Sequence, residues 1–453
     1  MNNDMHQSQY AAQTQYNASL FRFIKKSPTQ FHAVSNMAEK LDQNGFNQLK
    51  EENSWNLEKK NRYYVMRNNS SIIAFVMGEN EPWETGIKIV GAHTDSPCLR
   101  IKPVPELKCN SMTSLSVEIY GGALLNTWFD RGLNLAGRVT CLVQKKNVKE
   151  NEFLTSLLIN FNGQVAVIPS LAIHLDREAN KNKSVNPQFD VSPLFYLDGF
   201  SNKTSFKEIL LGQAQKEYPD ILIKKVFDFE MSFSNGEPPC YTGLNQEFIL
   251  GPRLDNLLSC HAGLKSLIAA DTKNSSMLVC TDHEEVGSES IAGARGSFLT
   301  SILARISQTP ERIGRTAAKS MMISWDNAHA VHPAHGERHD VNHLPKINKG
   351  PVLKINASLR YASNSESSAI FKFLCKKANT PLQTFVMRSD MPCGSTTGPL
   401  ISSKTGIKTV DAGAPTLAMH SISELTGIYD PYMVFKVTSQ LFSMTAQPLL
   451  SLT

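Results

Sequence analysis

Histidine and carboxylate residues follow two short apolar segments of this 453-residue chain. His93 and Asp95 follow the run IKIVGA, and Glu284 and Glu285 follow the run SMLVCT. A neutral imidazole is a good zinc ligand, and a nearby carboxylate can hold its second ring nitrogen. Two adjacent glutamates repel each other unless a cation or a proton intervenes. Each motif alone also fits a hydrogen-bonded or solvated loop, and only their combination indicates a metal site.

Three further residues extend this candidate set. Asp255 opens a predicted helix, Asp326 ends the apolar run SMMISW, and His420 lies in LAMHSISE. Taken singly, a first-turn carboxylate stabilises the helix dipole, and a histidine after an apolar run is usually a hydrogen-bonded core residue. These three residues nevertheless supply the remaining oxygen and nitrogen ligands that a metal centre needs.

The combined inventory is five ligands and one spare carboxylate. It suits two zinc-like ions that share a bridging carboxylate, and it needs no cysteine. A two-metal site lowers the pKa of a bound water and polarises a carbonyl or phosphoryl oxygen. The residues therefore predict a di-metal hydrolase.

The elements that would position these residues alternate between strands and helices. Period and composition predict strands at 87–92, 276–281, 320–325, 384–388 and 407–410, and helices at 254–270 and 431–441. Before them we expect a loose polar arm over about 1–17, helical segments within 20–46 broken at Ser27-Pro28, and a hairpin formed by 63–67 and 72–77. Buried strands that end in polar residues are the usual place for chemistry in an α/β sheet.

A β-rich section interrupts this alternation. Short strands are predicted at 115–120, 137–143, 157–161 and 165–168, and the segment near 230–239 is predicted to be a linker. We therefore predict an α/β fold whose mixed-sheet, di-metal core, sandwiched by helices, spans 1–95 and 236–453. The inserted β-rich domain would span 96–235.

Composition excludes several classes of protein. Lys and Arg total 46 against 41 Asp and Glu, and no basic run concentrates the net charge of +5, which argues against nucleic-acid binding. No uncharged apolar stretch reaches 18 residues, so no membrane span is expected. The eight cysteines are scattered without a CxxC pair, and the N-terminus lacks the regions of a signal peptide. These features predict a reduced, cytoplasmic protein.

Ten ordered blocks make the chain resemble the M18 family of metallo-aminopeptidases, the aspartyl aminopeptidases. The blocks are SPTQFHAV (27–34), GAHTDSPCLRIKPVP (91–105), YGGALLNTWFDRGLNLAGRV (120–139), IPSLAIHL (168–175), GPRLDN (251–256), DHEEVGS (282–288), WDNAHAVHP (325–333), NKGPVLKINASLRYAS (348–363), MRSDMPCGSTTGP (387–399) and LAMHSISE (417–424). They cover nearly the whole chain after the N-terminal arm.

The resemblance assigns a role to each candidate residue. It implies one metal on His93 and Asp326, a second on Glu285 and His420, and Asp255 as the bridge between them. Glu284 would be the general base, and Asp95 would orient His93. The ions implied are two divalent cations, zinc first, with manganese or cobalt compatible with the same ligands.

The resemblance also implies an assembly of several copies. His174, in the inserted domain, would reach the active site of a neighbouring subunit and steady the tetrahedral intermediate. Its other readings are a buried histidine and a further metal ligand. The inserted domain would be a dimerisation domain, and dimers would build a homo-oligomer, a tetrahedral dodecamer, whose interior sites accept short peptides.

The implied substrate is a peptide with an acidic N-terminal residue. A buried carboxylate of the substrate needs a cation, and Lys354 matches the lysine that the family uses there. Tyr361 and His329 match neighbouring pocket positions. Arg388 is a second candidate cation, although an internal ion pair with Asp390 is the favoured interpretation.

Several other functions compete with this one. They are an M18-type aminopeptidase that prefers neutral or basic N-terminal residues, a related di-metal deacylase or carboxypeptidase, and an inactive scaffold that keeps the fold. The scaffold would predict a broken ligand or base, yet all six key positions are intact. Without the resemblance, Lys354 would be read as a solvated strand lysine.

Overall fold

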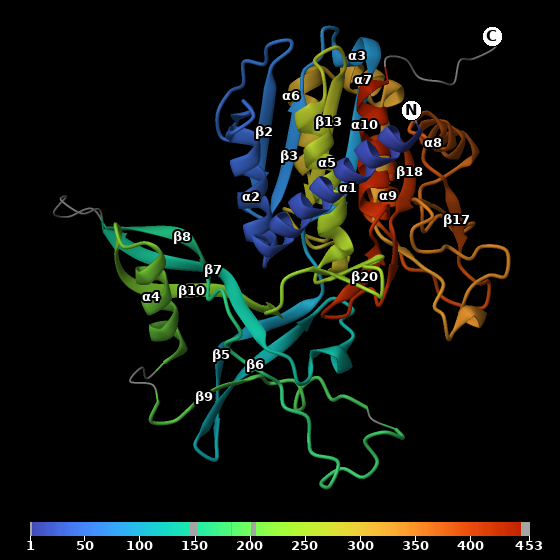
Figure 1. Ribbon diagram of the computed structural model, residues 1–453. Coiled ribbons are helices and arrows are strands. Elements are labelled where there is room, and N and C mark those ends of the chain that lie inside the picture. The colour runs from blue at the N-terminus through green and yellow to red at the C-terminus, as the bar shows by residue number, and fades with distance from the viewer. Residues whose placement is uncertain (1, 145–151, 183, 201–204, 445–453) are drawn as a thin grey trace. The chain divides into compact units, whose positions relative to one another are not determined.

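The computed structural model divides the chain into two compact units, which we describe separately (Figure 1). Unit 1 comprises Met1–Asp95, Pro239–Met419 and Glu424–Thr453, and unit 2 comprises Ser96–Pro238 and His420–Ser423. The residues described are 2–144, 152–182, 184–200 and 205–444, and the side chains of α1 are described from Tyr10 onward.

Unit 1 is built on two sheets. The nine-stranded sheet contains, in spatial order, β1 (Asn47–Gln48), β2 (Arg62–Arg67), β3 (Ser71–Val76), β13 (Ser275–Thr281), β4 (Ile87–His93), β14 (Met321–Trp325), β18 (Lys408–Gly413), β16 (Val352–Ile355) and β17 (Gln383–Val386). The smaller sheet contains β11 (Cys240–Thr242), β12 (Phe248–Gly251), β20 (Glu424–Gly427), β19 (Pro415–Leu417) and β15 (Ala328–His329). Parallel and antiparallel pairs occur in both sheets, so both are mixed.

Successive side chains of a strand point to opposite sides of the sheet, and in the central strands both sides are buried. In β3, Ile72 and Ala74 enter one hydrophobic core, whereas Ile73 and Phe75 enter another. Helices cover both faces, which explains why these strands read as continuous apolar runs in the sequence.

One face carries α1 (Asn2–Lys25), α2 (Gln30–Asp42), α5 (Leu254–Ala269), α8 (Ser365–Lys377) and α10 (Asp430–Ser443). The other carries α6 (Phe298–Ser307), α7 (Pro310–Lys319) and α9 (Thr397–Thr405), with the short α3 (Pro82–Thr85) packed against α7. The predicted helix-sandwiched α/β fold is thus confirmed for unit 1. Among the described helices, none combines the length and apolar character that a membrane crossing requires.

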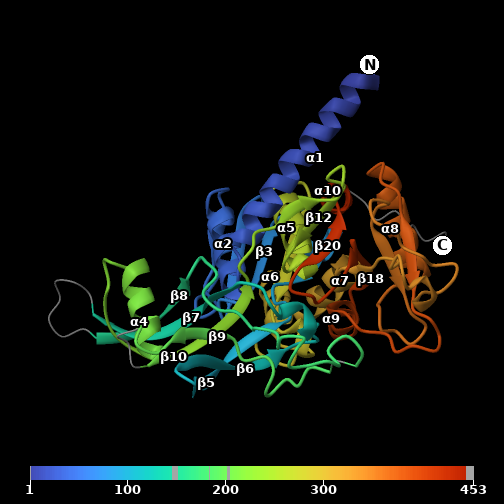
Figure 2. The same ribbon diagram turned by 60° about the horizontal axis from the view of Figure 1, so that its bottom comes forward.

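The predicted polar arm is wrong, because residues 2–25 form the single helix α1 (Figure 2). Its inner side buries Tyr16, Leu20 and Ile24. Two amides of this Gln/Asn-rich stretch, on Gln13 and Asn17, donate to the carbonyl of Ile428 at 2.8 and 2.9 Å. The amide NH2 groups of these two side chains therefore contact a segment far along the chain.

Unit 2 is a β-rich unit around one six-stranded sheet. Its strands are, in spatial order, β8 (Glu152–Asn160), β7 (Leu133–Gln144), β10 (Leu222–Asn235), β5 (Cys98–Cys109), β6 (Met112–Tyr120) and β9 (Leu194–Leu197), with the helix α4 (Phe206–Glu217) and the 3-10 turn η1 (Leu125–Trp128). The pairs between these strands are antiparallel.

Two local predictions in unit 2 are wrong. The expected linker near 230–239 is largely strand, because β10 continues to Asn235 and pairs with β7 up to Leu133. The expected strand at 165–168 forms only isolated bridges, such as Leu133 with Ala166. Asn, Gly and Pro residues suggested a linker at 230–239, and the apolar run at 165–168 has the composition of a strand. In both places the actual pairing depends on partners distant in sequence.

Candidate active site

The candidate ligands of unit 1 meet at one edge of the large sheet. β4 is parallel to both β13 and β14, so the three strands end on the same side. His93 is the last residue of β4 and is level with Thr281, the last residue of β13. Asp326 directly follows β14. Parallel pairing thus brings together residues that are far apart in the sequence.

Asp255 reaches the same place from the start of α5. Arg253 before it has a left-handed backbone with φ of 53°, which turns the chain from β12 into the helix. The amide of Asp255 donates to the carboxylate of Glu424 at 2.8 Å. The buried Asp255 carboxylate then lies 3.3 Å from Nε2 of His93, and Asp326 Oδ1 lies 3.9 Å from the same nitrogen.

This arrangement places excess negative charge around one buried imidazole. Burial alone lowers the pKa of His93, but hydrogen bonding to Asp255, Asp326 and Asp95 raises it well above its usual value. The site therefore calls for positive charge, either a proton on the imidazole or a bound cation. A divalent cation would supply this charge without the proton.

The donor set fits zinc. Ligand atoms of His93, Asp255 and Asp326 lie within 4.8 Å of one another, and so do those of His93, Glu284 and Glu285. One imidazole nitrogen and several carboxylate oxygens, without cysteine, are typical of an open catalytic zinc site. The residues that unit 1 brings together could therefore hold a divalent cation.

Asp95 contacts both His93 and the turn that follows β13. Nδ1 of His93 lies 3.0 Å from the backbone oxygen of Asp95 and 3.4 Å from its carboxylate. The Asp95 carboxylate accepts hydrogen bonds from the backbone amides of Glu284 and Glu285, at 3.2 and 3.1 Å. Asp95 therefore ties the end of β4 to the turn that carries the two glutamates, η2 (Glu284–Val286).

Glu284 has the properties of a proton acceptor that can hold a proton near neutral pH. Its pKa is raised to about 8: burial is the main cause, His93 opposes the rise, and the charges of Asp326, Asp95 and Asp255 contribute to it. A carboxylate of raised pKa is typical of general acid–base groups. A bound cation would lower this pKa again.

A buried lysine lies beside the ligand cluster. Lys354, on β16, is 4% exposed, and its Nζ lies 3.5 Å from Oδ2 of Asp326 and 5.4 Å from the centre of the Tyr361 ring. The ring of His329, an exposed residue, packs edge-on to Phe385, the β17 residue that pairs with Lys354, with centroids 5.7 Å apart. Lys354 is thus a buried cation and not a solvated strand lysine.

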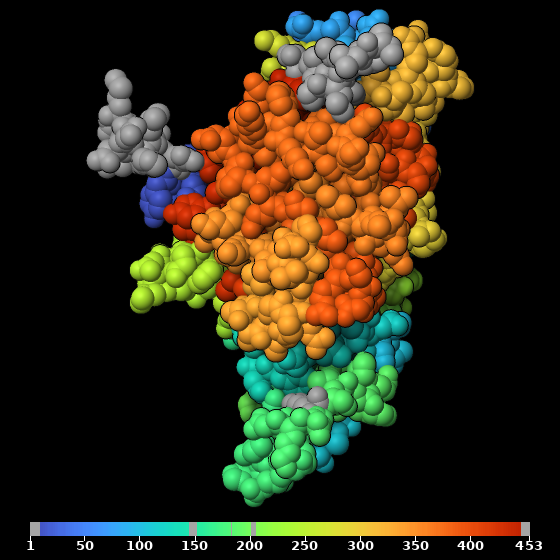
Figure 3. Space-filling view, turned by 90° about the vertical axis from the view of Figure 1, so that its right-hand side faces the viewer, coloured from blue at the N-terminus to red at the C-terminus, as the bar shows by residue number. Residues whose placement is uncertain are grey.

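Arg388 forms the ion pair predicted for it. Its Nε and Nη2 atoms lie 2.9 and 2.6 Å from the two carboxylate oxygens of Asp390. Arg388 also donates to the backbone oxygen of Glu337, which joins the loop after β15 to the segment after β17. Figure 3 shows this face of unit 1, where orange atoms of both segments lie at the surface.

Two predicted site residues belong to unit 2. His420 lies in the segment 420–423, where its Nδ1 is 3.3 Å from the backbone oxygen of Gly122. Ile422 of the same segment is buried in the unit 2 core. His174 is exposed on a loop of unit 2, which excludes the reading of a buried core histidine for this subunit. Their roles stay predictions.

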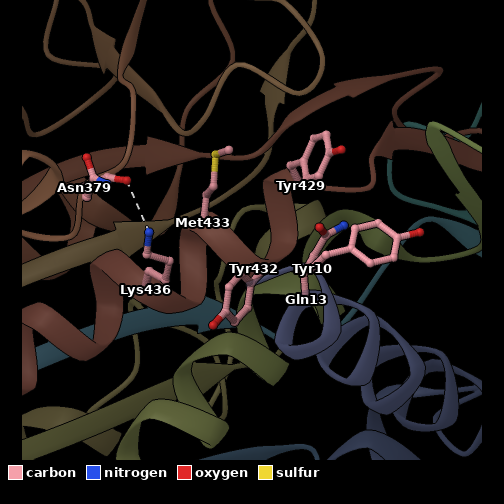
Figure 4. A pocket seen from close by; sticks show the side chains of 7 residues that line it. All are labelled: Tyr10, Gln13, Asn379, Tyr429, Tyr432, Met433 and Lys436. Atoms are coloured by element: carbon pink, nitrogen blue, oxygen red, sulfur yellow. Dashed lines mark hydrogen bonds between the residues drawn. The ribbon is translucent and has the colours of Figure 1, made fainter. Parts of the chain in front are cut away.

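A separate hollow of unit 1 has a different chemistry. It has a volume of about 490 Å³ and is lined by Tyr10, Gln13, Asn379, Tyr429, Tyr432, Met433 and Lys436 (Figure 4). Lys436 donates to the backbone oxygen of Asn379 at 3.2 Å. Neither a histidine nor a carboxylate lines this hollow, so it is unsuited to the metal chemistry described above.

Two buried acidic residues beside the site were missed by the sequence analysis. Glu424 fixes the backbone of Asp255, and Asp411 lies on β18 next to the strand of Lys354. Glu424 begins β20 after a polar segment, and Asp411 lies within β18, and nothing in their local sequence separates them from ordinary strand polar residues. Their partners become visible only in the folded chain.

Nearly the whole chain matches a known protein family and its members. The family described as "Aminopeptidase I zinc metalloprotease (M18)" matches residues 23–442. A protein of Azotobacter vinelandii, named "Probable M18 family aminopeptidase 2", is 47% identical over 435 residues, which cover 96% of this chain and 100% of that protein.

Solved structures share the fold over nearly the whole chain. A cryo-EM structure of an Ape4 and Nbr1 complex has a TM-score of 0.90 and 34% identity, covering 95% of this chain and 86% of that one. The mApe1 dodecamer of Saccharomyces cerevisiae has a TM-score of 0.79 and 26% identity, covering 94% and 95%.

Proposed function

Because this chain belongs to the M18 family of zinc aminopeptidases, we propose that it removes N-terminal Asp or Glu residues from short peptides at a two-zinc centre. The observation that carries the acidic preference is Lys354, a buried cation 3.5 Å from the candidate ligand Asp326. A buried ammonium next to the reacting centre can pair with a substrate carboxylate, which would otherwise be costly to desolvate.

The ligands would be divided between two ions. His93 and Asp326 would hold one ion, Glu285 and His420 the other, and Asp255 would bridge them. When bound, zinc polarises the carbonyl of the scissile peptide bond and lowers the pKa of a water molecule. Manganese or cobalt would serve the same oxygen and nitrogen ligands.

The protein's own residues would manage the proton. Glu284 would accept a proton from the attacking water and return it to the leaving amine. Its backbone amide is held by Asp95, so the carboxylate starts from a fixed turn. Tyr361 would support the Lys354 ammonium through its ring, and His329 would line the opening for the substrate.

His174 would act on a neighbouring copy of the chain. It is exposed in unit 2, and the related mApe1 of Saccharomyces cerevisiae is described as a dodecamer. We place the protein in the cytoplasm as a homo-oligomer, a dodecamer built from dimers, acting on peptides and not on nucleic acid or membranes. Mixing Glu284→Gln and His174→Ala subunits tests this role, because only a trans-acting His174 would restore activity in the mixed dimers.

Initial rates on matched Asp, Glu, Leu and Lys substrates test the acidic preference. The protein would be stripped of metal and reloaded with Zn, Mn or Co. We expect metal-dependent cleavage of the acidic substrates, and Lys354→Met should lower their kcat/KM by about 10- to 100-fold. Lys349→Met, at an exposed position nearby, is the matched control and should change little.

Two other outcomes would contradict the proposal. Faster cleavage of Leu or Lys substrates would support aminopeptidase activity but contradict the proposed preference for acidic N-terminal residues. No cleavage of any substrate by metal-loaded, oligomeric protein would favour the scaffold.

A further inference from the structure

Asp411 is a buried carboxylate that the mechanism above does not use. It lies in the middle of β18 and is fully buried. Burial raises its pKa, whereas the donors around it and the charge of Lys354 lower it. Burying a carboxylate costs free energy unless its oxygens accept hydrogen bonds, so the groups that donate to Asp411 stabilise it in the folded chain.

Those partners are the two segments next to the proposed substrate pocket. The amide of Ala362, directly after Tyr361, donates to Oδ2 of Asp411 at 2.5 Å. The hydroxyl of Thr396 donates to Oδ1 at 2.7 Å. The amide of Asp411 itself donates to the hydroxyl of Ser363 at 2.9 Å. One residue thus connects the Tyr361 segment and the Thr396 segment to the central sheet.

The strand register brings Asp411 to Lys354. β16 and β18 are antiparallel, and Leu353 pairs with Ala412. Lys354 and Asp411 are the next residues beyond this last pair on the two neighbouring strands. The Lys354 ammonium consequently has the charges of Asp326 and Asp411 near it.

The chain also leaves room for this carboxylate at Gly398. A Cβ atom at Gly398 would lie 2.3 and 2.4 Å from the two carboxylate oxygens of Asp411. These distances are shorter than any van der Waals contact, so a larger residue would displace the carboxylate or the loop. The backbone at the start of α9 therefore lies directly against the Asp411 carboxylate and leaves no space for a side chain at position 398.

We propose that Asp411 is a positioning residue of the substrate pocket. Its carboxylate fixes the segments of Tyr361 and Thr396 around Lys354 and thereby sets the affinity for the N-terminal side chain of the substrate. This inference rests on the proposed function of Lys354. It does not require Asp411 to touch the substrate or a metal.

The variant Asp411→Asn tests the proposal. An asparagine keeps one acceptor oxygen for the Ala362 amide, and its NH2 group would face the Thr396 hydroxyl, which must then change from donor to acceptor. The negative charge near Lys354 disappears. We expect KM for an Asp substrate to rise about tenfold while kcat stays within about threefold. The kcat/KM for a Leu substrate should change much less.

Asp430→Asn is the matched control. Asp430 is also fully buried and accepts hydrogen bonds from the backbone amides of Asn348 and Gly350, at 2.7 and 3.1 Å. Its replacement removes a comparable buried carboxylate away from Tyr361 and Thr396. We expect it to lower stability and to leave KM unchanged. Equal KM changes in both variants would show a merely structural role and overturn the proposal.

A readout independent of substrate separates this proposal from the proposed function. Amide hydrogen exchange of peptides covering 359–364 and 394–399 should become faster in Asp411→Asn and not in Asp430→Asn. If the wild type does not prefer acidic substrates, the proposed function fails. The hydrogen exchange rates, together with KM for whichever substrate is preferred, still decide the role of Asp411. Unchanged exchange and unchanged KM would overturn it.

Gly398→Ala approaches the same contact from the other side. It should raise KM as Asp411→Asn does, because the added methyl group meets the carboxylate. In the Asp411→Ser background, which removes the clashing oxygens, Gly398→Ala should have a smaller effect. Additive effects of the two changes would contradict a shared contact.

Discussion

His261 offers a prediction in which the stability difference between two proteins reverses with pH. This histidine lies on α5 and is buried against α1, where its ring meets those of Tyr16 and Phe23 at 4.8 and 5.6 Å. Its Nε2 lies 3.0 Å from the hydroxyl of Ser19. Burial, together with the charges of Lys265 and Arg22, lowers the pKa of His261 from 6.5 to about 3.

The sign of the effect follows from this direction. A folded-state pKa below the unfolded value means that the unfolded chain binds the proton more readily, so stability falls as the pH falls below 6.5. The loss is about 1.4 kcal/mol per pH unit, which gives about 2 kcal/mol at pH 5 and almost none at pH 7.5. It would continue to grow down to about pH 3.

The perturbation is His261→Phe, which keeps an aromatic ring and removes the titration. At pH 7.5 the variant loses the hydrogen bond to Ser19 and should be less stable by about 1 kcal/mol. At pH 5 it avoids the proton penalty and should be more stable by about 1 kcal/mol. The two stability curves should therefore cross near about pH 6.

Urea unfolding of metal-free protein at several pH values provides the assay. Chelator is needed because metal binding is itself pH-dependent. His32, whose pKa burial lowers to about 4, is present in both proteins, so its contribution cancels in the difference. A wild-type minus variant difference that stays the same at pH 7.5 and pH 5 would refute the reasoning.

Two further predictions concern Glu284 and Gly263. Glu284→Gln should lower kcat by about 10²- to 10⁴-fold with unchanged bound zinc, measured by elemental analysis, because the amide cannot accept the proton; loss of zinc would instead make Glu284 a ligand. Gly263→Ala should lower the stability of unit 1 by about 1–3 kcal/mol in urea unfolding, because its Cβ would lie 2.4 Å from Cδ1 of Leu278. Gly314→Ala, in α7 with open space around its Cβ position, is the control and should be neutral or stabilising, so equal losses would contradict the packing argument.

Much of unit 1 was predictable because its strands are buried on both faces. The apolar runs that end at His93 and Asp326 are strands β4 and β14, and the expected helix after Asp255 is α5. The parallel edge could be anticipated from these runs, and with it the meeting of the unit 1 ligands. All eight cysteines are free thiols, as the scattered spacing indicated.

What the sequence did not indicate depends on partners distant along the chain. The helix α1 was missed because its polar residues Gln13 and Asn17 find their acceptor at Ile428. Asp95 was expected to orient His93, and its carboxylate lies 3.4 Å from Nδ1 of His93; that it also accepts hydrogen bonds from the amides of Glu284 and Glu285 became visible only in the folded chain. The division of the chain at His420–Ser423 likewise has no local signal, since it rests on contacts such as Asn235 with Ser423 at 2.7 Å.

The strand order of unit 1 has a consequence for its synthesis on the ribosome. β4 is flanked by β13 and β14, and both emerge only after the whole of Ser96–Pro238 has been translated. All six strands of the unit 2 sheet emerge within that interval, so this sheet can form while β4 still has two open edges. Open apolar edges are sites of aggregation. A nascent chain stalled before β13 would therefore contain a folded unit 2 sheet and a β4 strand with both edges unpaired. Chaperones would matter most at this stage of synthesis.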